Sequence, residues 1–312
     1  MTILLLTTQL PVQAQNRAKI QQQVKEKISS LPVTVEFDVD YVGNNNIRQM
    51  MDLYQPKNPK TESLPAIVMI HGGGWRAGDR TRYASHAVRL ASTGNYVVFS
   101  LGYRLSEEAK WPAQIHDVKA GIRYIRANAK DYGIDPNRIG TWGSSAGGHL
   151  VSLLGTSADV EVLEGNLGPH TGVSSRVRCV VNQCGPQDLT KAIMYKNGKP
   201  VKEDPAVALL VEGPLSENPE VLVELSPLTY VTADDAPFLT LHGTKDLRVS
   251  YEQAEIIEEA LEKAGVESHL ISVVEGGHGL SHPELYSIVD QFFAHHLRDV
   301  KAEFSDRKLL PQ

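Results

Sequence analysis

The sequence predicts an α/β fold in which helices cover both faces of a mostly parallel sheet. From residue 33 onward, apolar runs of strand length alternate with longer segments of helical periodicity. Residues 66–70 and 96–101 are almost entirely apolar, which is typical of central parallel strands buried on both faces. The chain has 312 residues, 41% of them hydrophobic, which is enough for one large domain or two small ones.

The predicted elements follow in a simple order. Period-two alternation over residues 33–39 and, more loosely, 48–54, with asparagines at 44–46 between them, predicts an antiparallel hairpin. After the hairpin we expect strands at 66–70, 96–101, 138–142, 177–182, 237–241 and 268–274, and helices at 83–92, 112–132, 148–154, 251–264 and 283–297.

The domain limits follow from these elements. We expect the folded domain to span residues 33–305, with a polar lead-in at 15–32. The proline-rich segment 190–227 interrupts the alternation. We expect it to form helices or loops over the carboxyl edge of the sheet and to help shape a ligand crevice there. The alternative is a surface excursion without a role.

The N-terminus has features of a secretory signal. Residues 3–6 are apolar, and Val12-Gln13-Ala14 places small residues at the spacing of a signal-peptidase site, although a basic region is missing. Residues 1–14 are therefore interpreted as a possible signal-peptide remnant, and a secreted or periplasmic location is expected. The alternative is the frayed N-terminus of a cytoplasmic protein.

Composition argues against several classes of partner. The net charge is −6 and no block of Lys or Arg indicates nucleic-acid binding. No apolar run approaches the length of a membrane span. The eleven histidines and two cysteines show no metal-ligand spacing, so no metal is expected. Cys179 and Cys184, about 16 Å apart if extended, are too distant for a disulfide.

The most informative motif is Gly143-Ser144-Ser145-Ala146-Gly147. It lies between an expected strand and an expected helix, which is the context of a nucleophile elbow with Ser145 at its centre. Ser144 is not central and is not expected to be the nucleophile. The pattern is common by chance, so it requires partners.

A serine nucleophile requires a base and an orienting acid. Asp246 and His278 each follow an expected strand, so both are placed on loops beside the elbow, in the order serine, acid, histidine. We predict Asp246 as the acid and His278 as the base. Five other residues are weaker candidates for the two roles: Asp234, Asp235, Glu275, His242 and His282.

A glycine-rich loop follows the strand at 66–70. In His71-Gly72-Gly73-Gly74-Trp75 the backbone can turn its N–H groups into the site. The N–H groups of Gly73, Gly74 and Ala146 are predicted to form the oxyanion hole. A phosphate-binding loop is the weaker alternative, because no Gly-Lys-Ser/Thr follows. His71 is expected to support the loop, and Trp75 either lines the pocket or packs beneath the loop.

Four segments together resemble the α/β-hydrolase esterases. They are His71-Gly72-Gly73-Gly74-Trp75 with Gly78-Asp79, Tyr103-Arg104-Leu105, Trp111-Pro112-Ala113, and Gly143 to His149. The chain is similar to the hormone-sensitive-lipase-like group and most similar to bacterial feruloyl and acetyl-xylan esterases. The resemblance implies an α/β-hydrolase fold with a small cap-like insertion, Ser145, Asp246 and His278 as triad, and ester hydrolysis without a cofactor.

The expected substrates are acetyl or feruloyl esters of plant polysaccharides, or similar small esters. Kynurenine-formamidase-like enzymes share a His-Gly-Gly-x-Trp loop and remain an alternative, as does a non-catalytic binding module of the same fold. Fold analogy does not identify the acid or the alcohol of the substrate, and no oligomeric state is predicted.

Overall fold

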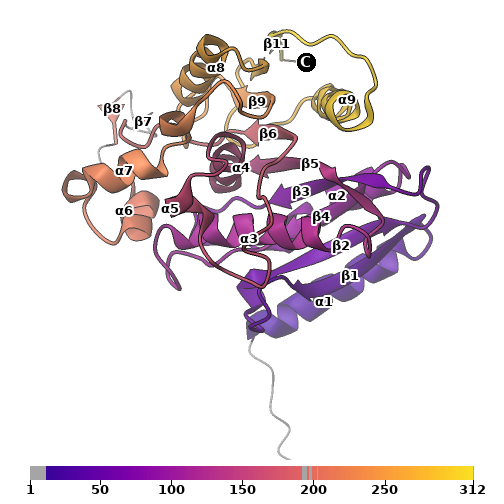
Figure 1. The fold of residues 1–312 in the computed structure, drawn as a ribbon. Helices are drawn as coiled ribbons and strands as arrows, with labels where there is room; N and C mark the ends of the chain where they lie inside the picture. Colours follow the sequence, from indigo (N-terminus) through magenta and orange to yellow (C-terminus); the bar gives the residue numbers. More distant parts are fainter. Residues whose placement is uncertain (1–11, 192–194, 197–198, 202, 312) are drawn as a thin grey trace, which may run out of the picture.

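The computed structural model describes residues 12–191, 195–196, 199–201 and 203–311. Its centre is a nine-stranded sheet in the order β1-β2-β4-β3-β5-β6-β9-β10-β11 (Figure 1). The strands span β1 Val33–Asp40, β2 Met50–Pro56, β3 Leu64–Ile70, β4 Val97–Leu101, β5 Ile134–Ser144, β6 Cys179–Gln183, β9 Phe238–Gly243, β10 Ser268–Val273 and β11 Arg307–Leu309. β2 is antiparallel to β1 and β4, and the other neighbouring pairs are parallel. The predicted hairpin and mostly parallel sheet are confirmed.

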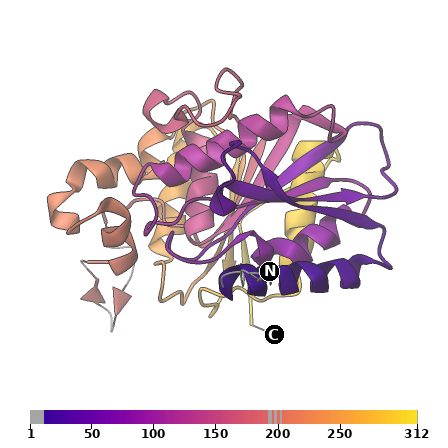
Figure 2. The same cartoon turned by 90° about the horizontal axis from the view of Figure 1, so that it is seen from below.

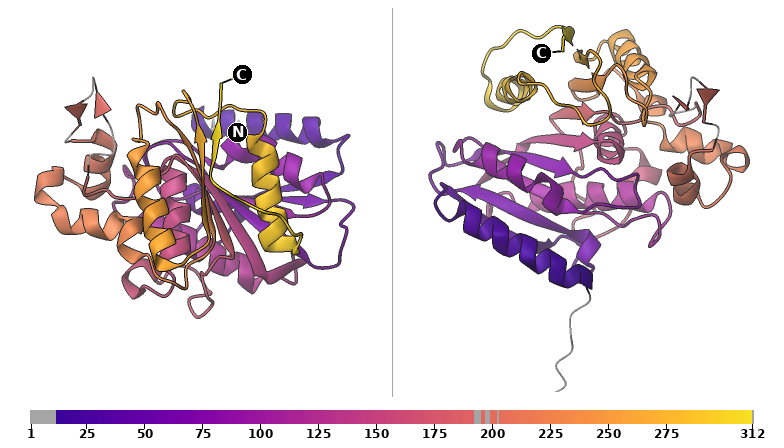
Figure 3. Two further views of the ribbon diagram at one scale, coloured as in Figure 1. Left: turned by 90° about the horizontal axis from the view of Figure 1, so that it is seen from above. Right: turned by 180° about the vertical axis from the view of Figure 1, so that it is seen from behind.

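Helices cover both faces of this sheet, as the alternation predicts. The helical elements outside the insertion are α1 Val12–Ile28, η1 Ile47–Gln49, η2 Arg80–Tyr83, α2 Ala84–Ala91, α3 Ala113–Ala127, α4 Ala146–Thr156, α5 Glu161–Glu164, α8 Glu252–Ala264 and α9 Leu285–Arg298. Figure 3 shows α8 and α9 on opposite sides of the strands at the yellow end of the sheet.

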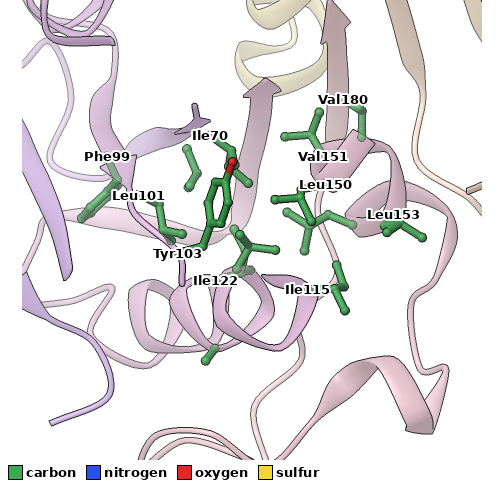
Figure 4. Close-up of a cluster of buried hydrophobic side chains, with 14 of the residues drawn as sticks. Ile70, Phe99, Leu101, Tyr103, Ile115, Ile122, Leu150, Val151, Leu153 and Val180 are labelled. Atoms are coloured by element: carbon green, nitrogen blue, oxygen red, sulfur yellow. The ribbon is translucent and has the colours of Figure 1, made fainter. Parts of the chain in front are cut away.

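Two separate hydrophobic clusters occupy the two faces. Along β3, Ala66, Val68 and Ile70 belong to one cluster, while Ile67 and Met69 belong to the other. Successive side chains of a strand point to opposite faces, so a strand buried on both faces must be apolar throughout. The first cluster, drawn in Figure 4, includes side chains of α3 and α4, and the second includes those of α2 and α9.

The insertion expected at 190–227 contains short elements. They are β7 Tyr195–Lys196, β8 Lys199–Pro200, α6 Pro205–Val211, η3 Leu215–Glu217, α7 Pro219–Leu225 and η4 Pro227–Tyr230. Asp204 starts α6, because its carboxylate accepts the N–H groups of Ala206 and Val207. The salmon-coloured insertion projects from one side of the molecule (Figures 1 and 2).

Several predicted boundaries were wrong. The strand expected at 48–54 begins at Met50, because residues 47–49 form η1, capped by the Asn46 side chain. The helix expected at 112–132 ends at Ala127. The sheet also continues past the expected domain end at residue 305, since β11 pairs in parallel with β10.

The expected lead-in is helical. α1 packs along β1, where the Gln21 side chain donates a hydrogen bond to Asp38 at 2.9 Å. The signal-like segment 1–14 lies outside the described residues except for its last three, which begin α1. Within the part of the chain that the structure describes, no helix has the length and hydropathy needed to cross a bilayer.

Candidate active site

Ser145 lies at a sharp turn between β5 and α4. Its φ of 55° and ψ of −122° are strained for a residue with a side chain. The flanking glycines make the turn possible. A Cβ on Gly147 would lie 2.0 Å from the carbonyl oxygen of Ile70, and one on Gly143 would lie 2.2 Å from that of Gly147. The structure therefore forms the predicted elbow at the carboxyl end of a central strand.

Asp246 and His278 meet beside this turn. Oδ2 of Asp246 lies 2.7 Å from Nδ1 of His278. The other oxygen, Oδ1, accepts the backbone N–H groups of Arg248 and Val249 at 2.7 and 3.0 Å. Burial raises the pKa of Asp246, but hydrogen bonds from His242, His278 and these backbone groups outweigh it and hold the pKa well below its usual range. The carboxylate is thus ionised and fixed in place against His278.

His242 contacts the same carboxylate but is oriented elsewhere. Its Nε2 lies 3.0 Å from the carbonyl oxygen of Val249 and 3.4 Å from Oδ2 of Asp246. The ring is fully buried and does not line the cleft described below. His242 therefore supports the acid loop, while His278 is half-buried and faces the cleft.

The remaining alternatives lie outside the site. Asp234 is exposed, precedes β9 and forms an ion pair with Arg176. Glu275 forms an ion pair with Lys245. His282 is bonded to the carbonyl oxygen of Leu310. None of these residues lines the cleft that contains Ser145.

The glycine loop lies against the elbow. A Cβ on Gly72 would lie 3.2 Å from that of Ser145, and Gly73 and Gly74 have φ of 130° and 59°. Within the described residues, no group accepts a hydrogen bond from the N–H of Gly73 or Gly74. Ala146 is the first residue of α4, where N–H groups have no intrahelical partner. These three donors are therefore available beside Ser145.

His71 holds this loop from beneath, as expected. Its ring is stacked on Tyr103 with 4.3 Å between centroids, and its Nδ1 donates to the carbonyl oxygen of Gly72 at 2.9 Å. The Tyr103 hydroxyl donates to the His71 carbonyl oxygen at 2.9 Å. Burial lowers the pKa of His71 to about 4, so the ring is neutral at neutral pH.

His149, on α4, is a supporting residue to which the sequence assigned no role. Its Nδ1 accepts the indole N–H of Trp75 at 3.3 Å, and its Nε2 donates to the carbonyl oxygen of Leu225 at 2.6 Å. The elbow helix thereby connects the glycine loop to the insertion. The only sequence signal for a role of His149 is its position directly after Gly148 in the elbow motif. Trp75 both packs on His149 and lines the cleft.

The site opens into a cleft of about 630 Å³. Ser145 and His278 both line it, together with the glycine loop. Asp204, Pro205 and Ala206 of the insertion form part of its wall. The predicted contribution of segment 190–227 to the pocket is therefore confirmed at these three residues.

The Trp111-Pro112 motif anchors the insertion. The indole N–H of Trp111 donates to the carboxylate of Glu224 at 2.7 Å, and its backbone N–H donates to Leu210 at 3.1 Å. Both acceptors belong to insertion helices. Two residues of the resembling motifs, Trp111 and His149, are thus hydrogen-bonded to the insertion, and Trp75 is bonded to His149.

The described residues include groups whose donor atoms could share a metal ion. The group beside the cleft contains Cys184, Asp246 and His278, of which only His278 lines the cleft. Here Oδ2 of Asp246 is hydrogen-bonded to Nδ1 of His278, and Oδ1 of Asp246 accepts two backbone N–H groups. This donor set fits a Ser-His-Asp triad better than a metal centre.

Comparison with known proteins identifies the family. The BD-FAE family model matches residues 51–261, which include the glycine loop, the elbow and Asp246. The chain belongs to the BD-FAE family. This result, with the nine-stranded sheet, confirms the resemblance to the α/β-hydrolase esterases.

Several proteins similar to this BD-FAE chain are named as esterases. A solved structure described as a truncated form of carbohydrate esterase from gut microbiota is 32% identical, with a TM-score of 0.79, covering 85% of this chain and 96% of that one. A bifunctional GH43-CE protein of Bacteroides eggerthii is 35% identical, with a TM-score of 0.78, over 84% of this chain and 35% of that one.

The curated relatives are longer proteins. Esterase LipC of Mycobacterium tuberculosis is 34% identical over 68% of this chain and 52% of its own length. The BD-FAE chain spans about half the length of the curated relatives first found by similarity.

Proposed function

We propose that the chain is a serine carboxylic-ester hydrolase. The observation that carries the proposal is the 2.7 Å hydrogen bond between the buried Asp246 and His278, which lines the same cleft as the strained Ser145. Hydrogen bonding of Nδ1 to an ionised carboxylate leaves Nε2 of His278 as the acceptor for the hydroxyl proton. The esterase names of the similar proteins support the same reaction class.

In the first half of the reaction, Ser145 Oγ attacks the ester carbonyl carbon while His278 takes its proton. The carbonyl oxygen becomes an oxyanion and is stabilised by the N–H groups of Gly73, Gly74 and Ala146. Loss of one such donor typically costs about 3–4 kcal/mol of transition-state stabilisation. Collapse of the intermediate breaks the bond to the alcohol oxygen, which takes the proton from His278.

In the second half, water hydrolyses the acyl-enzyme. The water oxygen attacks the acyl carbon while His278 takes a proton from the water. The same three N–H groups stabilise the second oxyanion. The proton then returns to Ser145 Oγ as the carboxylic acid leaves. Asp246 stays ionised and stabilises the imidazolium in both halves.

As substrates we propose acetyl or feruloyl esters of plant polysaccharides. The description of one similar structure as a carbohydrate esterase supports this class. A cleft open to solvent is suited to an ester on a larger carbohydrate.

We also propose a secreted or periplasmic location, to be tested by fractionation of the native host. Detection only in the cytoplasm would contradict it.

The direct test is a pair of measurements on purified protein and its Ser145→Ala variant. We expect fluorophosphonate to label the wild-type chain at Ser145, with turnover of 4-nitrophenyl acetate and methyl ferulate. The variant should fold and lose both labelling and turnover. If the Ser145→Ala variant retains more than a few per cent of the activity, the assignment of Ser145 as the nucleophile is contradicted. Faster hydrolysis of N-formylkynurenine than of the esters supports the formamidase alternative, and absence of labelling supports a binding module.

A further inference from the structure

Three arginines line the cleft that contains Ser145 and His278. They are Arg76, Arg82 and Arg248, and all three are exposed. Within the described residues, none of them forms an ion pair. The whole chain has a net charge of −6, so this concentration of positive charge is opposite in sign to that of the protein as a whole.

The acids beside the cleft are engaged elsewhere. Asp204 lines the cleft but is buried, and its Oδ1 caps α6 through two backbone N–H groups. Asp246 is bonded to His278. Glu275, on the His278 loop, forms an ion pair with Lys245. The three guanidinium groups are therefore left to interact with whatever enters the cleft.

Their positions in the chain relate them to the reacting groups. Arg76 follows Gly74 by two residues, and Arg248 follows Asp246 by two residues. Positive charge thus comes from both the oxyanion loop and the acid loop. A guanidinium group binds a carboxylate through two parallel hydrogen bonds, and a cleft lined by one sign of charge raises the local concentration of oppositely charged substrate.

We propose that the preferred substrates are esters that carry a carboxylate near the scissile bond, and that Arg76, Arg82 and Arg248 recognise it. This inference rests on the proposed function. For a carbohydrate substrate, the carboxylate is that of an acylated uronic acid. The same chemistry is present in a half-ester of a dicarboxylic acid, where the carboxylate belongs to the acyl part.

The experiment compares matched substrates in two arms. The first pairs an acetylated methyl glucuronoside with the corresponding acetylated methyl glucoside, so that the carboxylate is in the alcohol part. The second pairs mono-4-nitrophenyl adipate with 4-nitrophenyl hexanoate, so that it is in the acyl part. We expect kcat/KM to be at least about tenfold higher for the anionic member of one pair, as for one charged hydrogen bond, and the ratio to fall with added salt.

Variants test which residues carry the preference. Arg76→Gln, Arg82→Gln and Arg248→Gln should each lower the anionic-to-neutral ratio several-fold, and the triple variant should remove it. The backbone N–H of Arg248 still holds Asp246 after substitution, so only the guanidinium is lost. Arg176→Gln removes the same charge from an exposed site before β6 and should leave the ratio unchanged.

The outcomes separate this inference from the proposed function. Equal rates within both pairs, or a ratio that the cleft variants change no more than Arg176→Gln does, overturn the inference. If Ser145 is nevertheless labelled by fluorophosphonate and neutral esters are hydrolysed, the proposed function stands. If Ser145 is not labelled and no ester is hydrolysed, both fail.

Discussion

Nε2 of His149 lies 2.6 Å from the carbonyl oxygen of Leu225, so the elbow helix is joined directly to the end of α7. The two residues are 76 positions apart in the sequence, yet one buried imidazole connects their helices. Because the same ring accepts the indole N–H of Trp75, the elbow helix, the glycine loop and the insertion share one hydrogen-bonded centre.

His149→Ala should therefore affect both stability and catalysis. It leaves the Leu225 carbonyl and the Trp75 indole without partners and opens a cavity, so we expect unfolding free energy to fall by about 2–4 kcal/mol. We also expect kcat/KM for 4-nitrophenyl acetate to fall at least tenfold. Urea denaturation and steady-state kinetics measure the two effects.

Val151→Ala is the matched control, because Val151 is buried on the same helix and lies in the hydrophobic cluster. It should lose about 2 kcal/mol of stability with little change in kcat/KM. If the two variants lose activity in equal proportion, the link to the insertion has no catalytic role.

Stability should depend on pH through His149. Burial lowers its pKa to about 4, whereas the unfolded chain binds this proton near pH 6.5. Between these values the unfolded state holds more protons, so the stability contribution of the neutral ring is lost as pH falls from about 6.5 to about 4. The loss is roughly 3 kcal/mol for this group.

The measurement is urea unfolding across pH 4–8 for wild type and His149→Gln. Other titrating groups, such as Glu258 with its pKa raised to about 7 by burial, cancel in the difference between the two curves. The wild-type curve should fall more steeply below pH 6.5. Parallel curves would show that His149 does not titrate in this way.

Replacing each of the two histidines that contact Asp246 should affect kcat very differently. His278→Gln removes the proposed base and should lower kcat by about 10⁴-fold or more. His242→Gln keeps a donor for the Val249 carbonyl oxygen and leaves His278 bonded to Asp246, so kcat should fall less than tenfold. Comparable losses in both variants would mean that the base is misassigned. Circular dichroism of each variant checks folding.

Gly74→Ala should reduce turnover more than stability. Gly74 has φ of 59°, and an added Cβ would lie 3.2 Å from the Cβ of Ala206. Relief of this contact shifts the loop and its N–H groups, and we expect kcat to fall about 10- to 100-fold. Gly172→Ala is the control, since an added Cβ there meets nothing within 4 Å. A Gly74→Ala enzyme with wild-type kcat would remove this residue from the proposed oxyanion hole.

The sequence was sufficient to predict the sheet and to place the three residues of the proposed triad at one edge of it. Continuous apolar strands such as β3 indicate burial on both faces. The loops after parallel strands converge at one edge of the sheet, where Ser145 and His278 share a cleft and Asp246 is bonded to His278. The chemistry of each residue then follows from its type and neighbours. These inferences depend on local periodicity and chain direction, both of which are visible in one sequence.

What could not be predicted depends on long-range contacts. No local pattern indicates that His149 binds the carbonyl oxygen of Leu225, because the acceptor is a backbone atom on a distant helix. The three residues of β11 are too few for a periodic signal. The start of α6 could have been predicted from the sequence, since Asp204 followed by Pro205 is a recognisable helix beginning.

β11 also has a practical meaning for anyone who shortens or tags this chain. It covers the outer edge of β10, and the carbonyl oxygen of Leu309 accepts the N–H of Val274, a few residues before His278. Trimming the chain after residue 305 would uncover a row of free backbone donors and acceptors, which invites pairing between molecules. It would also remove the hydrogen bond that holds the start of the loop carrying His278. Fusion partners are therefore better attached through a spacer beyond the strand than in place of it.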